Sequence, residues 1–348
     1  MRTYNLALIG FGGVNRALAQ LVDDDPARFD HLGFALKVVA ITDLQMGSLI
    51  QADGIDLGAV LTLPRGTTFA SFPGGSATAD NEYVIRESPA DIAVEATFTN
   101  PVDGEPAASH VRWALESGKS VTTTNKGPVA LHGAELTRLA AANDAVFAYE
   151  GAVLSGTPVL GLARDQFAGL TIRGVQGILN GTSNYVLGRM EAGMALEEAV
   201  AEAQAEGYAE ADPTADIGGS DVQLKVAILA NELLGAGISP VDVDTTGITD
   251  ITADDIIAAA TAGKRYKLIG SAHRDADGRV ITKVAPQAVS ADHPLANIPG
   301  ATNAVSFDTD LLGTVTITGP GAGRVETAFA LITDIVSIHA HEKEKVVA

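Results

Sequence analysis

The chain has 348 residues, of which 46% are hydrophobic and 19% charged, and it contains no cysteine. This length exceeds the size at which a single core usually stops growing, so we expect two domains, and the composition excludes a disordered chain. A formal charge of −20 argues against nucleic acid or an anionic membrane as a partner, and the lack of cysteine excludes disulfides and thiolate metal sites.

The first 150 residues alternate short apolar runs with amphipathic segments. Two amphipathic segments, Glu105–Glu116 and Ala134–Ala142, are predicted as helices. Five apolar runs are predicted as buried strands: Leu6–Gly10, Val38–Asp43, Asp91–Thr97, Ser120–Thr124 and Val146–Glu150. The alternation predicts an α/β fold with a Rossmann-like, doubly wound parallel sheet that binds ligands at the carboxyl ends of its strands.

The N-terminus runs from Met1 directly into the first predicted strand. It lacks the basic region, long apolar stretch and cleavage site of a signal peptide. No window holds the roughly 18 uncharged apolar residues that a membrane-spanning helix needs. We therefore expect a cytoplasmic protein.

The turn after the first strand reads Gly10-Phe11-Gly12-Gly13-Val14-Asn15 and matches two thirds of the dinucleotide-binding fingerprint. Gly10 suits the tight turn, and Gly12 allows a pyrophosphate to approach the backbone at a helix N-terminus. Asn15 stands in place of the third glycine, which would keep the helix and strand apart unless Gly13 compensates. A plain glycine-rich turn is the alternative, but the position after the first strand favours a nucleotide site.

Asp43 ends the second predicted strand, where an acidic residue usually binds the ribose hydroxyls of NAD. Its spacing from the glycine-rich turn is longer than usual, and no arginine follows it directly. Lys37 or Arg65 could still reach a 2′-phosphate. The sequence therefore predicts NAD(P)(H) as the cofactor and leaves the choice between NAD and NADP open.

The pattern changes after Val159. A strand is predicted at Ile172–Leu179, followed by several helices and by strands around Val280–Val284 and Leu311–Ile317. These elements predict a second domain of the α+β type, and a short charged tail is expected at Glu342–Lys345.

Three polar segments are candidates for the chemistry. Thr122–Pro128 places Lys126 at the carboxyl end of a core strand, although a lone lysine there is more often a solvated loop residue. In Gly177–Tyr185, the backbone N–H groups and the Thr182 hydroxyl at a helix start suit a substrate carboxylate, and an ordinary helix cap is the alternative.

The third segment, Gly207–Lys225, leads into a helix that is apolar almost all round. The first turns of this helix hold Asp221 and Lys225, four residues apart on one face. Buried charges are costly without partners or a ligand. With Glu210 and Asp216 just upstream, four ionisable groups are expected to converge at one helix N-terminus. A structural ion cluster is the alternative.

The glycine-rich turn at Gly10, the three polar segments and the turn Gly319-Pro320-Gly321-Ala322-Gly323 follow one another in the order found in homoserine dehydrogenases. The chain therefore resembles this family over nearly its whole length. The resemblance implies hydride transfer between NAD(P) and the pair L-homoserine and L-aspartate 4-semialdehyde, in threonine, methionine and isoleucine biosynthesis. It implies that Lys126 and Lys225 are catalytic lysines, with Asp221 orienting Lys225. The implied substrate pocket consists of Gly181, Thr182, Tyr208, Glu210, Asp216 and Asp221.

The resemblance also implies a nucleotide site and a cation site. The implied nucleotide contacts are Gly10, Gly12, Gly13, Val14, Asn15, Asp43, Thr97, Asn125, Lys126 and Gly323. The implied ligands of a Na⁺ or K⁺ ion are Glu150 and the carbonyls of Val153, Ser155 and Thr157, beside a dimer contact. We therefore expect a homodimer or a dimer of dimers.

The domain organisation expected from this resemblance has three parts. Residues 1–149 and 322–348 would bind the dinucleotide, 150–157 and 296–321 would form the dimerisation region, and 158–295 would bind the substrate. Because the chain stops at Ala348, it resembles the short, monofunctional form without a C-terminal regulatory domain. Two rival classes remain: an oxidoreductase for another amino-acid aldehyde or imine, and a non-catalytic dinucleotide sensor.

Overall fold

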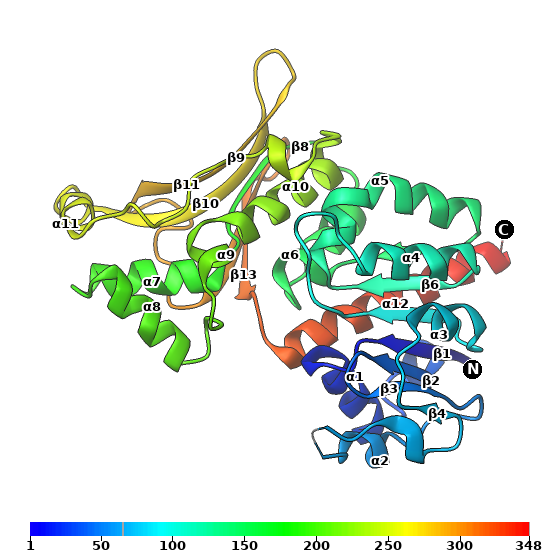
Figure 1. Ribbon diagram of the computed structural model, residues 1–348. Helices are drawn as coiled ribbons and strands as arrows, with labels where there is room; N and C mark the ends of the chain where they lie inside the picture. The colour runs from blue at the N-terminus through cyan, green and yellow to red at the C-terminus, as the bar shows by residue number, and fades with distance from the viewer. Residues whose placement is uncertain (65, 348) are drawn as a thin grey trace. The chain divides into compact units, whose positions relative to one another are not determined.

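The computed structural model describes residues 1–64 and 66–347, which form two compact units (Figure 1). The first unit comprises Met1–Ala152 and the C-terminal segment from Gly323 onward, and the second unit is Val153–Ala322. None of the helices in the described part of the chain combines the length and the hydropathy that a membrane span requires.

The first unit is built on a seven-stranded sheet in the order β4-β3-β2-β1-β5-β6-β7. Strands β2, β1, β5, β6 and β7 are parallel, and β3 and β4 extend the sheet in antiparallel fashion. Its strands are β1 (Arg2–Ile9), β2 (Phe34–Asp43), β3 (Gly47–Ile50), β4 (Gly75–Ser76), β5 (Ile92–Glu95), β6 (Ser120–Thr123) and β7 (Phe147–Ala148). Its α-helices are α1 (Gly13–Asp24), α2 (Leu57–Leu61), α3 (Asn81–Glu87), α4 (Ala107–Glu116), α5 (Lys126–Ala142) and α12 (Arg324–Val347), and α6 (Gly151–Leu154) crosses into the second unit.

Alternation along β1 explains why helices cover both faces of this sheet. Successive side chains of a strand point to opposite faces. Leu6 and Leu8 belong to one core cluster, with residues of α1, α2 and α12, whereas Ala7 and Ile9 belong to the other, with residues of α3, α4 and α5. Because both faces are buried, the strand reads as a continuous apolar run.

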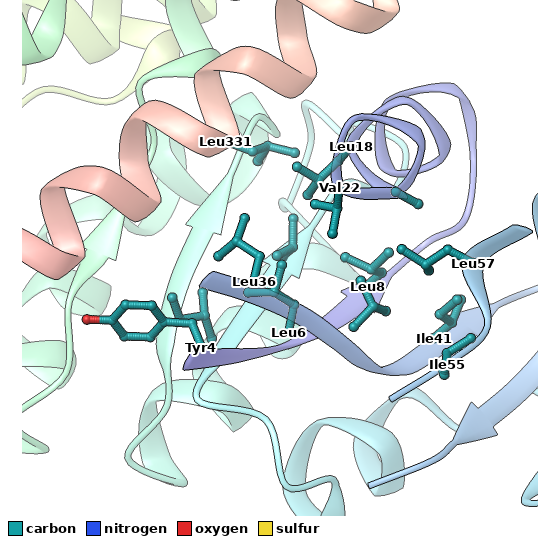
Figure 2. Packing of buried hydrophobic residues seen from close by; sticks show 14 of the residues in the cluster. Tyr4, Leu6, Leu8, Leu18, Val22, Leu36, Ile41, Ile55, Leu57 and Leu331 are labelled. Carbon is teal, nitrogen blue, oxygen red and sulfur yellow. The ribbon is translucent and has the colours of Figure 1, made fainter. Parts of the chain in front are cut away.

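The C-terminal helix α12 completes the first unit. Its Leu331 lies in the same buried cluster as Leu18 and Val22 of α1, as Figure 2 shows. At the other end of α12, the Tyr4 hydroxyl contacts His339 Nδ1 at 2.9 Å. The charged segment Glu342–Lys345, which we expected to be a tail, is part of this helix, because α12 continues to Val347.

The second unit contains a six-stranded sheet in the order β13-β12-β8-β10-β11-β9, with helices on one side. Its strands are β8 (Ile172–Ile178), β9 (Asp244–Thr245), β10 (Lys264–Arg274), β11 (Val280–Ser290), β12 (Thr302–Thr309) and β13 (Gly313–Pro320). Its α-helices are α7 (Gly181–Glu191), α8 (Leu196–Ala205), α9 (Thr214–Ile217), α10 (Ser220–Leu234) and α11 (Ala253–Thr261).

Helix α10 packs directly on this sheet at Gly270 of β10. A β-carbon at Gly270 would lie 2.7 Å from Val222 Cγ1 and 2.6 Å from Val226 Cγ2, so only glycine admits the helix at this distance. The contact fixes the first turns of α10 against the sheet, near the end of β8.

The predicted fold class is confirmed, with differences in detail. Each of the five strands predicted in the first unit is present, although their ends differ by a few residues. Helix α5 begins at Lys126 rather than Ala134. Strands β10 and β12 were not predicted, because their side chains mix polar and apolar residues without strict alternation.

Candidate active site

The glycine-rich turn lies where the strand order of the first sheet reverses, between β1 and its neighbours β2 and β5. Gly10 has φ +79°, and a β-carbon there would lie 3.0 Å from the Ala96 carbonyl oxygen, so glycine is required. A β-carbon at Gly12 would meet no atom within 4 Å. Gly12 immediately precedes α1, and its backbone is open to an approaching phosphate group.

Asn15 takes over the structural task of the missing third glycine. The side chain is buried, and Nδ2 donates to the carbonyl oxygens of Gly10 at 2.7 Å, Val94 at 3.2 Å and Ile9 at 3.3 Å. The amide therefore ties α1 to the ends of β1 and β5 instead of holding the helix away. Val14, the next residue of α1 after Gly13, packs partly buried against the core.

Asp43 ends β2 beside the glycine-rich turn. Its Oδ2 accepts a hydrogen bond from the Phe11 N–H at 2.9 Å, and its Oδ1 accepts from Gln45 N–H at 2.9 Å and Met46 N–H at 3.2 Å. These backbone donors fix the carboxylate at the carboxyl edge of the sheet.

Lys37 and Arg65 were the two basic residues expected to be able to reach a 2′-phosphate. Lys37 pairs with Asn5 in the register of β1 and β2, six residues before Asp43. At a strand rise of about 3.3 Å per residue it lies about 20 Å from the end of β2, so it belongs to the other half of the strand and the expectation that it reaches the site is wrong. Arg65 lies outside the described residues.

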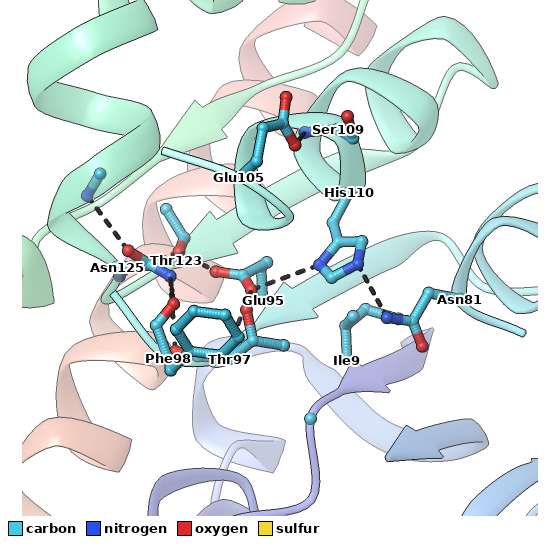
Figure 3. A network of polar contacts seen from close by, with 12 residues as sticks. Ile9, Asn81, Glu95, Thr97, Phe98, Glu105, Ser109, His110, Thr123 and Asn125 are labelled. Atoms are coloured by element: carbon cyan, nitrogen blue, oxygen red, sulfur yellow. Dashed lines mark hydrogen bonds and ion pairs between the residues drawn. The ribbon is translucent and has the colours of Figure 1, made fainter. Parts of the chain in front are cut away.

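Thr97, Asn125 and Lys126 follow the ends of β5 and β6. The Asn125 side chain caps α5 by accepting from Gly127 N–H at 3.1 Å, and its Nδ2 donates to the Phe98 carbonyl oxygen at 2.9 Å (Figure 3). Lys126 is half-buried and opens α5. All three residues therefore lie at the same edge of the sheet as Gly10 and Asp43.

Gly323 brings the start of α12 to the glycine-rich turn. It has φ +129°, and a β-carbon on Gly13 would lie 3.0 Å from Cδ and Nε of Arg324, the next residue. The Arg324 side chain therefore crosses the backbone of Gly13.

Lys225 is the centre of a buried polar cluster in the second unit. Its Nζ lies 2.7 Å from Asp221 Oδ2 and donates to the Leu179 carbonyl oxygen at 2.6 Å, directly after β8. The side chain of Asn180 extends the cluster, because Nδ2 donates to Asp216 Oδ1 at 2.7 Å and to Asp221 Oδ2 at 3.1 Å. Three of the four predicted ionisable groups thus meet at the start of α10.

Glu210 is the fourth group, and it is exposed. Among the described residues its carboxylate has no hydrogen bond or ion pair, so the structure does not join it to the cluster. Nearby, Thr182 Oγ1 donates to the Tyr208 carbonyl oxygen at 2.5 Å, which connects the start of α7 to the loop that carries Glu210. A β-carbon at Gly181 would lie 2.5 Å from the Ala301 carbonyl oxygen, so glycine is required there.

The four residues predicted to bind a monovalent cation are all buried. Glu150 is 5% exposed, and its backbone N–H donates to the Asp334 carboxylate. Val153 and Thr157 are buried, and the Thr157 hydroxyl donates to the Pro320 carbonyl oxygen at 3.0 Å. Ser155 adopts φ +53°, an uncommon value for a residue with a side chain.

Two polar residues next to the predicted site residues were not singled out from the sequence: Asn180, within the candidate segment Gly177–Tyr185, and Glu95. Asn180 is the cap of α7 and also bridges two carboxylates, and the cap position was the only signal in the sequence. Glu95 is a carboxylate at the end of a buried apolar strand, and that position is the signal that could have identified it.

The first unit has the sheet order and glycine turn of a dinucleotide-binding domain, and the second holds a buried lysine paired with a carboxylate. Together they define an NAD(P)-dependent oxidoreductase. Two family models match the chain: homoserine dehydrogenase, NAD binding domain, at residues 10–150, and homoserine dehydrogenase at residues 158–336.

Similar proteins agree with these matches. The chain is 57% identical over 347 residues to an NAD(+)-dependent homoserine dehydrogenase of Pseudomonas canavaninivorans, covering 99% of each chain. The structure of a homoserine dehydrogenase from Thiobacillus denitrificans is similar with a TM-score of 0.85 and 30% identity, over 99% of this chain and 75% of that one. A hyperthermophilic archaeal homoserine dehydrogenase in complex with NADPH has a TM-score of 0.83 and 28% identity, over 97% and 98% of the two chains.

The chain therefore belongs to the homoserine dehydrogenase family. It is an NAD(P)-dependent oxidoreductase that interconverts L-homoserine and L-aspartate 4-semialdehyde. Because the matches extend through both units, they favour this family over the two rival classes considered from the sequence.

Proposed function

We propose that Lys225 stabilises and protonates the oxygen atom of the substrate when the aldehyde is reduced. Negative charge develops on that oxygen during hydride addition, and an ammonium within hydrogen-bond reach can both stabilise and protonate it. The nicotinamide, when bound, supplies the hydride. The observation that supports the role is the fixed position of Nζ between Asp221 Oδ2 at 2.7 Å and the Leu179 carbonyl oxygen at 2.6 Å.

The burial of Lys225 argues against a purely structural ion pair. The Lys225 and Asp221 side chains are 8% and 15% exposed, so both charges lose most of their hydration. A buried ion pair is often no more stabilising than an apolar pair of the same volume. A functional need for the charge therefore explains its presence better than a gain in stability does.

The same cluster suits an amino-acid substrate. We propose that Asp216, with Asp221 and Glu210, binds the substrate ammonium, and that the turn at Gly181 and Thr182 binds the carboxylate, with Tyr208 lining the pocket. Asn180 supports this role because it holds the two aspartates in fixed positions. Exposure of Glu210 means that its carboxylate is available to an incoming ligand.

Lys126 is proposed as the second catalytic lysine. It stands at the carboxyl edge of the first sheet, where Gly10, Asp43, Thr97 and Asn125 also lie. Replacing Lys126 with methionine and measuring kcat with homoserine tests the role, and a folded Lys126→Met enzyme with the parent kcat would refute it.

NAD(H) is proposed to serve at least as well as NADP(H). Backbone N–H groups fix the Asp43 carboxylate at the end of β2, where an acidic residue is expected to face the adenosine ribose and would repel a 2′-phosphate. The nearby Arg16 guanidinium donates to the Phe11 carbonyl oxygen at 3.0 Å and lies over the Phe11 ring, so it is held by the protein. The 57% identical relative is named as NAD(+)-dependent, which agrees with this preference.

A monovalent cation is proposed at Glu150 and the carbonyls of Val153, Ser155 and Thr157. A buried carboxylate and a loop residue in a left-handed conformation are the features that support it, because hard cations take oxygen ligands and a turned backbone can direct carbonyls inward. Within the described residues, no cluster of three or more His, Cys, Asp or Glu side chains offers a metal site of another kind.

Residues 150–157 and 296–321 are proposed as the dimerisation region of a homodimer or a dimer of dimers. Leu311 and Leu312 in this region are 73% and 61% exposed, beside the edge strand β13. Exposed apolar side chains next to a sheet edge favour a protein contact. Size-exclusion chromatography with light scattering tests the oligomer.

We also propose that the enzyme acts in the cytoplasm, in threonine, methionine and isoleucine biosynthesis.

A further inference from the structure

Glu95 is a buried carboxylate for which the reaction described above has no use. It ends β5, is 1% exposed, and pairs in register with Thr123 of β6. Its Oε1 accepts from the Thr97 N–H at 3.0 Å and from the Thr97 hydroxyl, and its Oε2 accepts from the Thr123 hydroxyl at 2.9 Å (Figure 3). One carboxylate thus binds residues from the ends of two adjacent strands.

These contacts continue into the loops that carry the proposed nucleotide and catalytic residues. The Thr123 hydroxyl also accepts from the Asn125 N–H at 3.0 Å, and Asn125 Nδ2 donates to the Phe98 carbonyl oxygen at 2.9 Å. The loop after β5 and the loop after β6 are therefore connected twice by hydrogen bonds, once through the Glu95 carboxylate and once through the Asn125 side chain. Lys126 follows Asn125 directly.

His110 of α4 lies beside Glu95 on the side away from Thr123 and makes no hydrogen bond to it. Its Nδ1 lies 3.6 Å from Glu95 Oε1, and its Nε2 lies 2.8 Å from Asn81 Nδ2 (Figure 3). Asn81 Oδ1 accepts from the Thr42 hydroxyl at 2.7 Å, which leaves the amide nitrogen to donate to Nε2. In a neutral ring the proton then resides on Nδ1 and faces Glu95.

A purely structural role does not explain a charge at this position. The ends of β5 and β6 are already joined by their backbone ladder, and a neutral side chain there would avoid the desolvation that a buried carboxylate suffers. What the carboxylate adds is a fixed orientation of Thr97 and Thr123, because it accepts hydrogen bonds from both.

We propose that Glu95 is a positioning residue that fixes the loops after β5 and β6 and thereby orients the nucleotide contacts Thr97 and Asn125 and the lysine Lys126. The proposal rests on the proposed roles of these three residues. It requires no contact between Glu95 and any ligand, since Glu95 acts through the two threonines.

The test compares Glu95→Gln with Glu105→Gln as a matched control. Glu105 lies at the end of the loop between β5 and α4, is 40% exposed at its side chain, and accepts a hydrogen bond from Ser109 N–H of α4 rather than from Thr97 or Thr123. Glutamine keeps the volume of Glu95 but replaces one acceptor oxygen with a donor. We expect Glu95→Gln to raise the Kd for NADH at least threefold and to lower kcat at least tenfold, with the KM for homoserine within threefold of the parent. Glu105→Gln should change none of these values by more than twofold.

Thr123→Val provides a second variant if Glu95→Gln does not fold. It replaces the hydroxyl with a methyl group of similar size and should shift NADH affinity and kcat in the same direction. The proposal is overturned if a folded Glu95→Gln, or Thr123→Val in its place, keeps NADH Kd and kcat within twofold of the parent. Failure of the proposed role of Lys126 is seen separately, as a parent-like kcat in Lys126→Met, because NADH binding by the Glu95 variant is measured without turnover.

Discussion

The ammonium of Lys225 lies 2.7 Å from the carboxylate of Asp221, one turn earlier on α10. On an exposed helix this i, i+4 pair would contribute only about 0.3–0.5 kcal/mol. Here both residues lie against the end of β8, and Asn180 holds the same Asp221 oxygen from the other side at 3.1 Å. The pair is therefore part of a polar cluster whose side chains are held in place before a substrate binds.

Asn180 should be sensitive to the introduction of charge. In Asn180→Asp the side chain keeps an oxygen for the cap of α7 at Ser183 N–H but replaces the donor between Asp216 and Asp221 with a third negative charge. A lost hydrogen bond to a charged group costs about 1.5–3 kcal/mol. We expect the KM for homoserine to rise at least tenfold, and more than in the neutral control Asn180→Ser. Equal KM values in the two variants would show that charge at this position is unimportant.

Cofactor preference should follow from Asp43. We expect kcat/KM with NAD⁺ to equal or exceed that with NADP⁺, because the fixed carboxylate repels a 2′-phosphate. A tenfold change in the ratio of kcat/KM for NAD⁺ to kcat/KM for NADP⁺ corresponds to only about 1.4 kcal/mol. Because removing one negative charge can supply this energy, Asp43→Ser should shift the ratio towards NADP⁺ at least tenfold. A parent enzyme that favours NADP⁺ tenfold or more would contradict the assignment.

Stability should depend on the monovalent cation. An ion present at tenfold its Kd adds about 1.4 kcal/mol to the free energy of unfolding. We therefore expect a higher Tm in NaCl or KCl than in choline chloride at equal ionic strength. Glu150→Gln should abolish this difference, whereas Glu82→Gln, an exposed carboxylate of α3, should preserve it. A parent Tm that is the same in all three salts would remove the proposed site.

The free energy of unfolding should fall on acidification, in part because of His339. Burial, with the Lys343 ammonium as a second cause, lowers the pKa of His339. The unfolded chain therefore takes up this proton more readily, and stability is lost as the pH falls below about 6.5 towards the folded pKa. We expect urea denaturation between pH 7 and pH 5 to show a smaller loss for His339→Gln than for the parent. The exposed control His31→Gln should match the parent, and an unchanged slope in His339→Gln would disprove the contribution.

The first unit was largely predictable because its signals are local. Both faces of the sheet are buried, so β1 and β2 contain the continuous apolar runs Leu6–Ile9 and Val38–Ile41, and Gly10 and Gly12 mark the turn between strand and helix. The second unit was less predictable. Its strand β10 mixes exposed and buried positions, and its strand β12 buries polar as well as apolar side chains, so neither shows the regular alternation on which a prediction from sequence depends.

The candidate site shows a similar contrast. Spacing along one helix was enough to pair Asp221 with Lys225, because residues four apart share a face. The bridge from Asn180 to Asp216, 36 residues apart, depends on how the start of α7 packs against α9 and leaves no pattern in the sequence. Glu210 is near Asp216 in the sequence, but it lies in an exposed loop outside the bonded cluster.

The most direct test of the account is the kcat of Lys225→Met with homoserine and NAD⁺, measured beside thermal melts. Methionine keeps much of the volume and removes the ammonium, while Asp221 retains its hydrogen bond from Asn180. Proton transfer by a positioned group contributes about 10²–10⁴-fold, so we expect kcat to fall at least a hundredfold, with NADH binding unchanged and the protein folded. The control Lys283→Met, which removes an exposed ion pair with Asp244, should keep the parent kcat. A folded Lys225→Met enzyme with near-normal kcat, or a lowered Tm with unchanged kcat per folded molecule, would contradict the catalytic role.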